Sequence, residues 1–407
     1  MGNSTLVNTN GETYRWIAFG GAFNPYTNTG ASDFAIGAYF GNGIDNRTIS
    51  RLPFNPDFVL IKRFGASSAV WRTTNITGDN TLFLLGNPLT SDLIQNITSN
   101  TFEVGTNAIV NANGNIYHWV AFKIGSNFNI GTYTGSGSSA NITSVGFRPE
   151  LVWVKHTGSN NGVFASTAIN FMLGLTQYFV NLGNITSRII GFYKNGFSLG
   201  GNLGETNLTG NTYYYAAWND SNYSFSSVDI VDGSGNSISS PSTSLNNTPF
   251  SFDCTSSNGV LGTPTQRIRI IRLGNSPQWN LNIAATSSPT ALWQNTSATQ
   301  FFDFNDPTSS GCADGGDSDS YGGQMSIDST SAIINGIQVG CTATGISFGT
   351  GSFVQGTTDS ITLATATSSA DNDCYWDLTN INVNQVIPPE VTLDNYSINL
   401  TLTLVAI

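Results

Sequence analysis

Residues 34–62 read FAIGAYFGNGIDNRTISRLPFNPDFVLIK, and residues 128–155 read FNIGTYTGSGSSANITSVGFRPELVWVK, which is the same pattern written twice. The correspondence continues downstream, where NGNIYHWVAF at residues 113–122 returns as TGNTYYYAAW at residues 209–218. Equivalent residues lie about 95 positions apart, a period that fits a whole domain rather than a solenoid repeat. The sequence therefore predicts two copies of one domain in tandem.

Each copy has the pattern of an antiparallel β-sandwich. Gly-rich turns at residues 41–43 and 135–137 follow short strand-like segments, and glycine tolerates the positive φ of tight turns. A Phe-x-Pro-acid segment then leads into runs at residues 58–62 and 151–155 that are apolar up to a final lysine. Proline fits just before a strand, and an unbroken apolar run is typical of a strand buried on both faces. We expect four valines and isoleucines of these runs in the cores: Val59, Ile61, Val152 and Val154.

These segments carry a resemblance to a known family. FNPDFVLIK at residues 54–62 and FRPELVWVK at residues 147–155 resemble the F-x-P-D-h-V-W-h-K segment (h, apolar) of a module found in phage tail-fibre proteins. That module also ends in a T-N-G-x-x-Y-x-x-W strand, to which residues 113–122 and 209–218 are similar. The resemblance covers roughly residues 1–220. It implies an extracellular or virion-borne structural module with no known chemistry.

The composition indicates a folded protein with an uncharged surface. Of 407 residues, 39% are hydrophobic and 12% aromatic, which is enough to form cores. Only 10% are charged, against about 25% in ordinary globular proteins. The formal net charge of −11 argues against nucleic-acid binding, which needs a basic surface. No apolar run has the length of a membrane span, so we expect none.

The first residues repeat the closing strand of the module without a module in front of it. Residues 10–19 read NGETYRWIAF, and residues 1–33 are interpreted as an orphan closing strand and loop. This predicts either a piece of a longer protein or a strand that pairs elsewhere. A strand of this kind can add to an exposed sheet edge in its own chain or in a neighbour's. The candidate assembly-strand residues are Tyr14, Trp16 and Ala18, and the residues that alternate with them also include large apolar groups.

The remaining boundaries follow from composition and alternation. The two sandwich repeats are predicted at residues 34–124 and 125–220, followed by a Ser-, Gly- and Asn-rich linker at residues 221–249. A different domain occupies residues 250–407. It ends in YSINLTLTLV at residues 396–405, which alternates over its whole length and predicts the last strand of an immunoglobulin-like or pilin-like sandwich.

This last domain resembles one seen in predicted surface proteins of uncultivated, small-genome bacteria. The resemblance is carried by WNLNIAAT at residues 279–286, FDFND at residues 302–306, GCADGGDSDSYGG at residues 311–323 and CYWDLT at residues 374–379. TTDSITL at residues 357–363 and the close from residue 387 belong to the same pattern. It implies display at the cell surface and does not imply an activity.

One acidic block is a candidate calcium site. Ca²⁺ takes six to eight oxygen ligands, and loops rich in Asp, Asn and Gly supply them. The spacing is not that of an EF-hand, and the alternative is a solvated acidic loop. The candidate ligands are Asp303, Asp306, Asp314, Asp317 and Asp319.

All four cysteines lie in the last domain, and an even number in an exported domain favours two disulfides with three possible connectivities. Zinc is a weaker alternative because there is no C-x-x-C pair, and buried free thiols are a third. The residues are Cys254, Cys312, Cys341 and Cys374.

No catalytic motif is present, so we expect no enzyme. His118 and His156 have no Ser or Asp partner at motif spacing, and there is no P-loop, G-x-S-x-G or H-E-x-x-H. The sequence predicts an extracellular structural protein, a subunit of a surface filament or adhesive fibre, at the cell surface or in a virion. The expected partner is a further copy of the same chain, as a homo-oligomer or self-polymer. The alternative is a tail-fibre-like protein that binds a receptor or a cell-surface glycan, with Trp71, Trp153 and Tyr213–Tyr215 as stacking aromatics.

Overall fold

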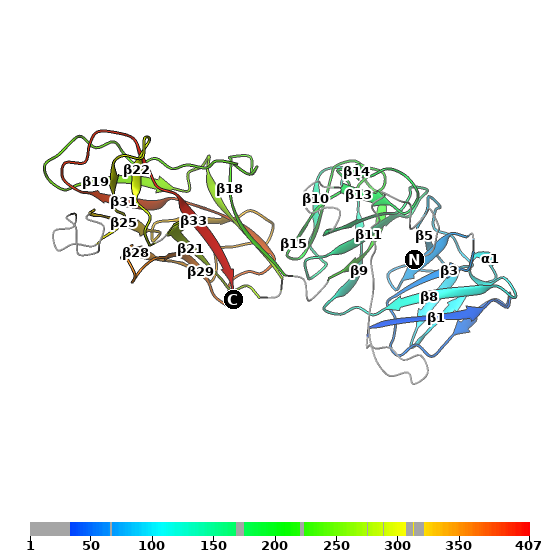
Figure 1. Ribbon diagram of the computed structural model, residues 1–407. Helices are drawn as coiled ribbons and strands as arrows, with labels where there is room; N and C mark the ends of the chain where they lie inside the picture. Colours follow the sequence, from blue (N-terminus) through cyan, green and yellow to red (C-terminus); the bar gives the residue numbers. More distant parts are fainter. Residues whose placement is uncertain are drawn as a thin grey trace. The chain divides into compact units, whose positions relative to one another are not determined.

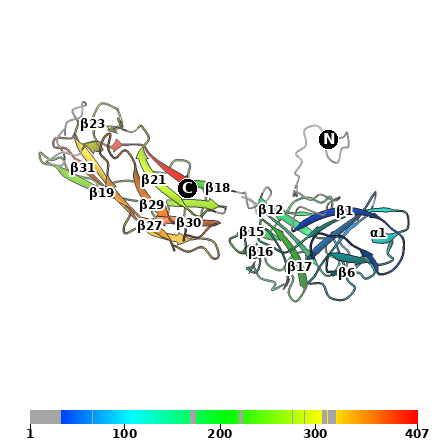
Figure 2. The ribbon, with the colours of Figure 1, turned by 90° about the horizontal axis from the view of Figure 1, so that it is seen from below.

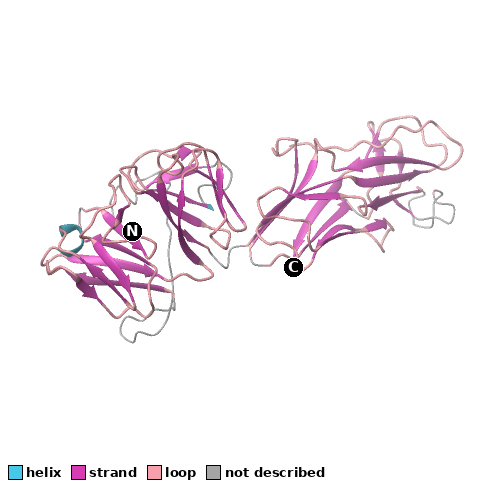
Figure 3. Ribbon diagram, turned by 180° about the vertical axis from the view of Figure 1, so that it is seen from behind, coloured by secondary structure: helices cyan, strands magenta, loops and turns pink. Residues whose placement is uncertain are grey.

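The computed structural model describes residues 33–65, 67–167, 175–219, 224–274, 276–287, 289–306, 312 and 321–407. In this part of the chain nearly every regular element is a strand, and the paired strands of every sheet are antiparallel (Figure 3). One short helix, α1 (Ala108–Asn111), begins at Asn107, whose side chain accepts a hydrogen bond from the backbone N–H of Ile109. The predicted all-β fold of antiparallel sandwiches is confirmed.

The chain divides into two compact units. The first holds residues up to Val145, Glu150–Gly191 and Phe197–Asn219. The second holds Gly146–Pro149, Phe192–Gly196 and Asp220–Ile407. The two sequence repeats, here called module A and module B, therefore belong largely to one unit.

Module A has a large sheet and a small one. Figure 1 shows β1, β8 and β3 of the large sheet side by side. The large sheet has the order β1-β8-β3-β4-β5 and the small sheet the order β2-β7-β6. Their bounds are β1 (Phe34–Phe40), β8 (Ile116–Phe122), β3 (Phe58–Arg63), β4 (Ala69–Thr73), β5 (Leu82–Phe83), β2 (Arg47–Ile49), β7 (Thr101–Val104) and β6 (Ile94–Thr98).

Module B repeats this arrangement. Its large sheet has the order β14-β13-β12-β11-β17-β9, and its small sheet the order β10-β16-β15, with β15 and β16 side by side (Figure 2). The bounds are β14 (Ile185–Thr186), β13 (Leu175–Tyr178), β12 (Val163–Ser166), β11 (Leu151–His156), β17 (Thr212–Trp218), β9 (Phe128–Thr134), β10 (Ala140–Ile142), β16 (Gly196–Leu199) and β15 (Ile189–Tyr193). Apart from the added β14, the strands of the large sheet occur in the order of module A read from the other edge, and β10-β16-β15 correspond to β2-β7-β6.

The apolar runs take the positions that the sequence predicts. Val59 and Ile61 of β3, and Val152 and Val154 of β11, are each 0% exposed. They point toward the small sheet, while the alternate residues of both strands face the opposite, outer side of the large sheet. That outer side is also largely covered, which explains why the runs are apolar at nearly every position.

The second unit is a larger sandwich of antiparallel sheets. Strands β18-β20-β30-β26 form one sheet, β19-β31-β25-β24 a second with β28 paired to β25, and β27-β29-β21-β33 a third. A small sheet, β23-β22-β32, adjoins them. The bounds are β18 (Phe225–Val231), β19 (Thr255–Leu261), β20 (Arg267–Leu273), β21 (Trp279–Ala285), β22 (Trp293–Asn295), β23 (Phe301–Phe302), β24 (Asn305–Asp306), β25 (Gly323–Asp328), β26 (Ile333–Gly336), β27 (Ile346–Phe348), β28 (Thr350–Ser352), β29 (Ile361–Ala366), β30 (Cys374–Thr379), β31 (Ile381–Ile387), β32 (Tyr396–Ser397) and β33 (Leu400–Ala406).

One expected linker contains a strand. Within the predicted linker at residues 221–249, β18 pairs with β20 along its whole length, from Phe225↔Leu273 to Val231↔Arg267. Its Ser and Asp residues gave the segment the composition of a linker. The ladder to β20 nevertheless satisfies its backbone groups, so the second sandwich begins before residue 250.

The last strand shows the predicted alternation in a shorter form. β33 pairs with β21 at the edge of its sheet, and β32 is separated from it by two residues. Leu400, Leu402 and Leu404 pack against the core, whereas Thr401 and Thr403 are exposed. That core is built around Trp279 and Trp376, whose ring centroids are 5.8 Å apart.

Candidate functional site

The lysine that ends each apolar run closes a turn. The Lys62 Nζ donates hydrogen bonds to the carbonyl oxygens of Arg63 (2.9 Å) and Gly65 (2.7 Å). The Lys155 Nζ donates in the same way to His156 (2.6 Å) and Gly158 (2.8 Å). The repeated lysine thus stabilises the backbone that follows the strand.

Lys155 has a further partner in the other module. Its Nζ also donates to the carbonyl oxygen of Asn87 in module A, at 3.0 Å. Lys155 is 1% exposed, and burial lowers its pKa to about 8. Backbone hydrogen bonds from Gly162 N to Leu84 O and from Leu89 N to Thr157 O connect the same segments.

A tyrosine pair is repeated with its hydrogen bonds. Tyr39 stacks on Tyr117 and Tyr133 on Tyr213, each with ring centroids 5.2 Å apart. The hydroxyl groups of Tyr39 and Tyr133 donate to the carbonyl oxygens of Val110 and Thr206, both at 2.6 Å. Burial raises the pKa of both hydroxyls well above the ordinary value.

A buried asparagine is repeated as well. Asn111 donates to the carbonyl oxygens of Ile44 and Gly105, and Asn207 donates to those of Ser138 and Gly200. Each asparagine also accepts a backbone N–H, from Asn42 at 3.0 Å and from Ser136 at 2.8 Å. The polar residues that the repeat retains are therefore used to hold loops and turns.

An aromatic cluster joins the two modules through the outer faces of their large sheets. Phe122 and Trp218, which are equivalent in the two copies, contact each other with centroids 5.5 Å apart. Phe58 contacts Trp153 at 6.1 Å, and Phe122 contacts Phe128 at 5.0 Å. Apolar side chains from both modules form this one buried cluster.

The aromatics weighed for sugar stacking lie in these packed regions. Trp71 and Tyr213 are 0% exposed and Tyr215 is 1% exposed, and Tyr214 is also buried. Trp153 is partly buried against the aromatic cluster. A sugar ring cannot reach the buried rings, so the stacking prediction is wrong for Trp71 and Tyr213–Tyr215. These aromatic residues are covered on the inner face by the small sheet of their own module or on the outer face by the other module.

The second sandwich carries a groove that the sequence did not indicate. It has a volume of about 730 Å³ and is lined by residues of β19, β22, β31 and β32. Figure 1 shows β19, β22 and β31 close together at one end of the second sandwich. Most of its lining side chains are hydroxyls, amides and apolar groups, and Asp394 is the one charged residue among the described lining residues. An uncharged, hydroxyl- and amide-rich groove suits a ligand of the same character.

Three aromatic residues form one wall of this groove. Trp293 stacks on Phe302 with centroids 5.6 Å apart and an interplanar angle of 12°, and Tyr396 meets Phe302 edge-on at 5.0 Å. The Trp293 Nε1 donates to the Gln385 Oε1 at 2.8 Å. Gln385 is 1% exposed and in turn donates to the carbonyl oxygens of Asp303 and Val386. A buried amide therefore fixes the orientation of the indole ring.

Exposed apolar side chains include a lining residue of the groove and the two neighbours in sequence of the lining residue Ser251. Phe250 and Phe252 form an edge-on pair with centroids 5.1 Å apart, and Phe252 is 75% exposed. Leu393, which lines the groove, is 73% exposed. The lining residues of the groove come from segments far apart in the sequence, so no local sequence motif predicts the groove.

The acidic block is only partly described. Asp303 and Asp306 are buried, and the Asp303 Oδ1 accepts the backbone N–H groups of Phe304 (2.6 Å) and Asn305 (3.3 Å). Asp314, Asp317 and Asp319 lie outside the described residues. Within the part of the chain that is described, no three His, Cys, Asp or Glu side chains are grouped as metal ligands. The calcium site stays a prediction.

The four cysteines form two disulfides, Cys254–Cys312 and Cys341–Cys374, one of the three connectivities left open by the sequence. Their Cα atoms are 6.0 Å and 5.7 Å apart, within the usual range for disulfides. Two disulfides indicate a protein of an oxidising, extracellular environment. No helix among the described residues has the length and hydropathy needed to cross a membrane.

His156 and the residues of the predicted assembly strand remain to be placed. The His156 Nδ1 accepts the backbone N–H of Gly158 at 2.9 Å, which makes this ring part of the turn closed by Lys155. The assembly-strand residues Tyr14, Trp16 and Ala18 lie outside the described residues.

Comparison with known families gives one match. A family model described as a domain of unknown function, DUF7483, matches residues 123–386, well over half of the chain. The chain belongs to the DUF7483 family. The DUF7483 match covers module B and most of the second sandwich, including both disulfides and much of the groove. No curated protein and no solved structure matches.

Proposed function

We propose that this chain is a non-enzymatic extracellular structural protein, a subunit of a surface filament or adhesive fibre at the cell surface or in a virion. The observation that carries the proposal is the use of the repeated polar residues. Lys62 and Lys155, and Asn111 and Asn207, all hydrogen bond to backbone carbonyls of their own modules. The polar residues that both copies share therefore stabilise the fold of the module, as expected of a structural protein.

Other features support the same class. The two disulfides of the second sandwich resist unfolding outside the cell. The shared aromatic cluster makes modules A and B one compact unit. Disulfides and a shared core of this kind are expected of a fibre subunit, which must stay folded outside the cell and under mechanical force.

Electron microscopy of the purified full chain, together with sedimentation over a range of concentrations, tests this proposal. A fibre subunit should form filaments or regular oligomers that grow with concentration. Particles that remain single chains under all conditions, including added calcium, would refute the filament.

A second candidate function is the binding of a cell-surface glycan in the groove of the second sandwich. The Trp293–Phe302–Tyr396 wall supplies apolar ring faces beside many hydroxyls and amides. Sugars present the same combination, since their C–H faces pack on aromatic rings and their hydroxyls form hydrogen bonds. The absence of basic residues from the described lining set disfavours a phosphorylated or sulfated ligand.

Glycan-array screening of the full chain, followed by titration, tests this candidate. Asn246→Ala and Asn395→Ala change exposed lining residues and should weaken binding without affecting the fold. Asn113→Ala, at an exposed position of module A, is the matched control. Binding that is equal in all three variants would exclude the groove as the binding site.

A further inference from the structure

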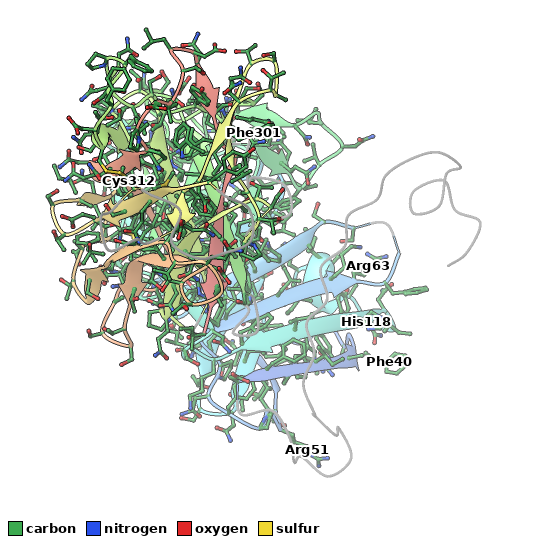
Figure 4. The ribbon with its side chains drawn as sticks, turned by 60° about the vertical axis from the view of Figure 1, so that its left-hand side comes forward. Phe40, Arg51, Arg63, His118, Phe301 and Cys312 are labelled. Atoms are coloured by element: carbon green, nitrogen blue, oxygen red, sulfur yellow. A yellow bond between two sulfur atoms is a disulfide. The ribbon has the colours of Figure 1, made fainter. Side chains whose placement is uncertain are left out.

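The outer face of the large sheet of module A ends in an exposed apolar row. Phe40 of β1 lies opposite Ile116 of β8, and the backbone N–H of Phe64 donates to the Ile116 carbonyl at 2.9 Å. The three side chains are 65%, 37% and 72% exposed in the order Phe40, Ile116, Phe64. We call Phe40, Ile116 and Phe64 the apolar row. Figure 4 shows Phe40 and the nearby His118 on neighbouring strands of this sheet.

Module B shows that the fold does not require apolar residues at these positions. The equivalents of Phe40, Ile116 and Phe64 are Thr134, Thr212 and Thr157. Phe40 and Thr134 directly follow equivalent tyrosines, Ile116 and Thr212 directly precede equivalent tyrosines, and Phe64 and Thr157 come two residues after the equivalent lysines. The register is the same. Thr134 lies opposite Thr212, and the Thr157 N–H donates to the Thr212 carbonyl at 3.2 Å.

The difference between the two modules at these three positions indicates that the apolar side chains have a role outside the fold of module A. Three exposed apolar side chains in one row cost solubility and add nothing to the core, since threonine serves the same backbone in the copy. Contiguous apolar surface of this kind marks an interaction site. The row is therefore a feature of module A in its own right.

The neighbouring part of the same face already packs against a module. Along β1, Phe34 packs against the aromatic cluster shared with module B, whereas Ile36 is 53% exposed. The equivalent of Ile36 in module B is Ile130, which is 5% exposed because it lies in that cluster. The exposed surface from Ile36 to the apolar row is thus continuous with an existing module–module interface.

We propose that the apolar row, together with Ile36, is the docking face for a second copy of this chain, which packs its own module A there with the outer sheet faces opposed. This inference rests on the proposed structural function, for which it supplies the self-association surface. A two-fold contact of this kind is self-complementary, since apolar groups meet their own equivalents. Within one chain the equivalent residues Phe122 and Trp218 already meet in this manner.

Two charged groups beside the row bind backbone carbonyls, and one of them is Arg47, whose Nη1 donates to the carbonyl oxygen of Phe40. The Lys62 ammonium is held by the carbonyl oxygens of Arg63 and Gly65. It is therefore directed into its own turn. His118 lies between Ile36 and the row, and its ring contacts that of Phe64 with centroids 6.5 Å apart.

The copy itself suggests the variants. The full chain carrying Phe40→Thr, Ile116→Thr and Phe64→Thr has in module A the residues that module B carries at the same backbone positions. Ile190→Thr, which changes a 42% exposed residue of module B, is the matched control. Thermal unfolding of each variant establishes that it is folded.

Sedimentation velocity provides the readout, over a roughly hundredfold range of concentration. We expect wild type and Ile190→Thr to associate and the triple variant to stay a single chain. Wild type that remains a single chain, or a triple variant that associates equally well, would overturn the proposal. Hydrogen exchange provides a second test. If deletion of residues 1–32 makes the β1 amides exchange faster in a protein that stays a single chain, the N-terminal segment covers the row, and the proposal is overturned as well.

Failure of the docking face and failure of the proposed filament can be distinguished in these experiments. A discrete dimer through the apolar row, without filaments in electron micrographs, supports the docking face and refutes the filament. Filaments formed by the triple variant support the filament and refute the docking face.

Discussion

Lys155 of module B donates a 3.0 Å hydrogen bond to the carbonyl oxygen of Asn87 in module A, so one buried ammonium serves two modules. Among the described residues, its counterpart Lys62 donates to the two carbonyls of its own turn. The same residue of the repeat thus closes a turn in one copy, and in the other also fixes an interface.

Replacing the two lysines separates these roles. Lys155→Met would leave three carbonyl oxygens without their donor in a buried place, and an unsatisfied buried acceptor costs about 1–3 kcal/mol. Lys62→Met removes two hydrogen bonds from a more exposed turn and should cost less. Urea unfolding of the two variants and wild type measures the difference. Equal losses would mean that the bond to Asn87 contributes nothing.

The same lysine predicts a pH dependence. Burial lowers the pKa of Lys155 from 10.5 to about 8. Between these values the unfolded chain binds more protons than the folded chain, so the contribution of this group to the free energy of unfolding rises with pH.

Wild type should therefore gain on the order of 2–3 kcal/mol relative to Lys155→Met between about pH 8 and 10.5. Urea unfolding of both proteins at several pH values provides the measurement, and Lys155→Met serves as the reference for all other titrating groups. A difference that stays constant over this range would contradict the lowered pKa.

Two glycines beneath aromatic rings give a third prediction. A Cβ on Gly37 would collide with the indole of Trp119, and one on Gly131 with the ring of Tyr215. Gly37→Ala and Gly131→Ala should each destabilise by about 1–3 kcal/mol through overpacking. Gly125→Ala, where an added Cβ meets nothing within 4 Å, is the control and should be nearly neutral. Thermal melts that do not distinguish the three would show that the rings move aside freely.

Much of the fold of the modules could be predicted because it is local and repeated. The Phe-x-Pro-acid run placed Val59 and Val152 in buried strands, and both are 0% exposed. The alternation in residues 396–405 likewise gave the half-buried edge strand β33. Local patterns of this kind are set by the strand period and by burial.

The features that were missed depend on segments far apart in the chain. Trp71 and Trp153 lie on the outer faces of their own sheets, and only the packing of one module on the other buries them. The groove joins Trp293 to Gln385 and Tyr396 through contacts that no spacing encodes. A position-by-position comparison of the two copies would have revealed the apolar row, since Phe40 faces solvent where Thr134 stands in the copy.

Calcium removal tests the acidic block. If Asp303, Asp306, Asp314, Asp317 and Asp319 share a cation, chelator should lower the melting temperature and added calcium should restore it. The stabilisation follows RT ln(1 + [L]/Kd), about 2.7 kcal/mol at a hundredfold excess of ligand over Kd. Asp317→Asn and Asp319→Asn should abolish the response, with Asp45→Asn of module A as the control. A melt that chelator does not change would exclude the site.

The two disulfides predict that reduction acts on one unit alone. All four cysteines belong to the second sandwich, and the bonds close loops with sequence separations of 58 and 33 residues. Each bond restricts the unfolded chain and should contribute about 2–4 kcal/mol. Scanning calorimetry with reductant should therefore lower the transition of the second sandwich and leave that of the modules unchanged.

The module pair contains no cysteine and serves as the control within the same molecule. The paired variants Cys254→Ser/Cys312→Ser and Cys341→Ser/Cys374→Ser should each reproduce part of the loss. Their costs should be similar, since the entropy of closing a loop depends only on the logarithm of its length. If reductant lowers the module transition instead, the second sandwich stabilises the modules, and the two units do not unfold independently.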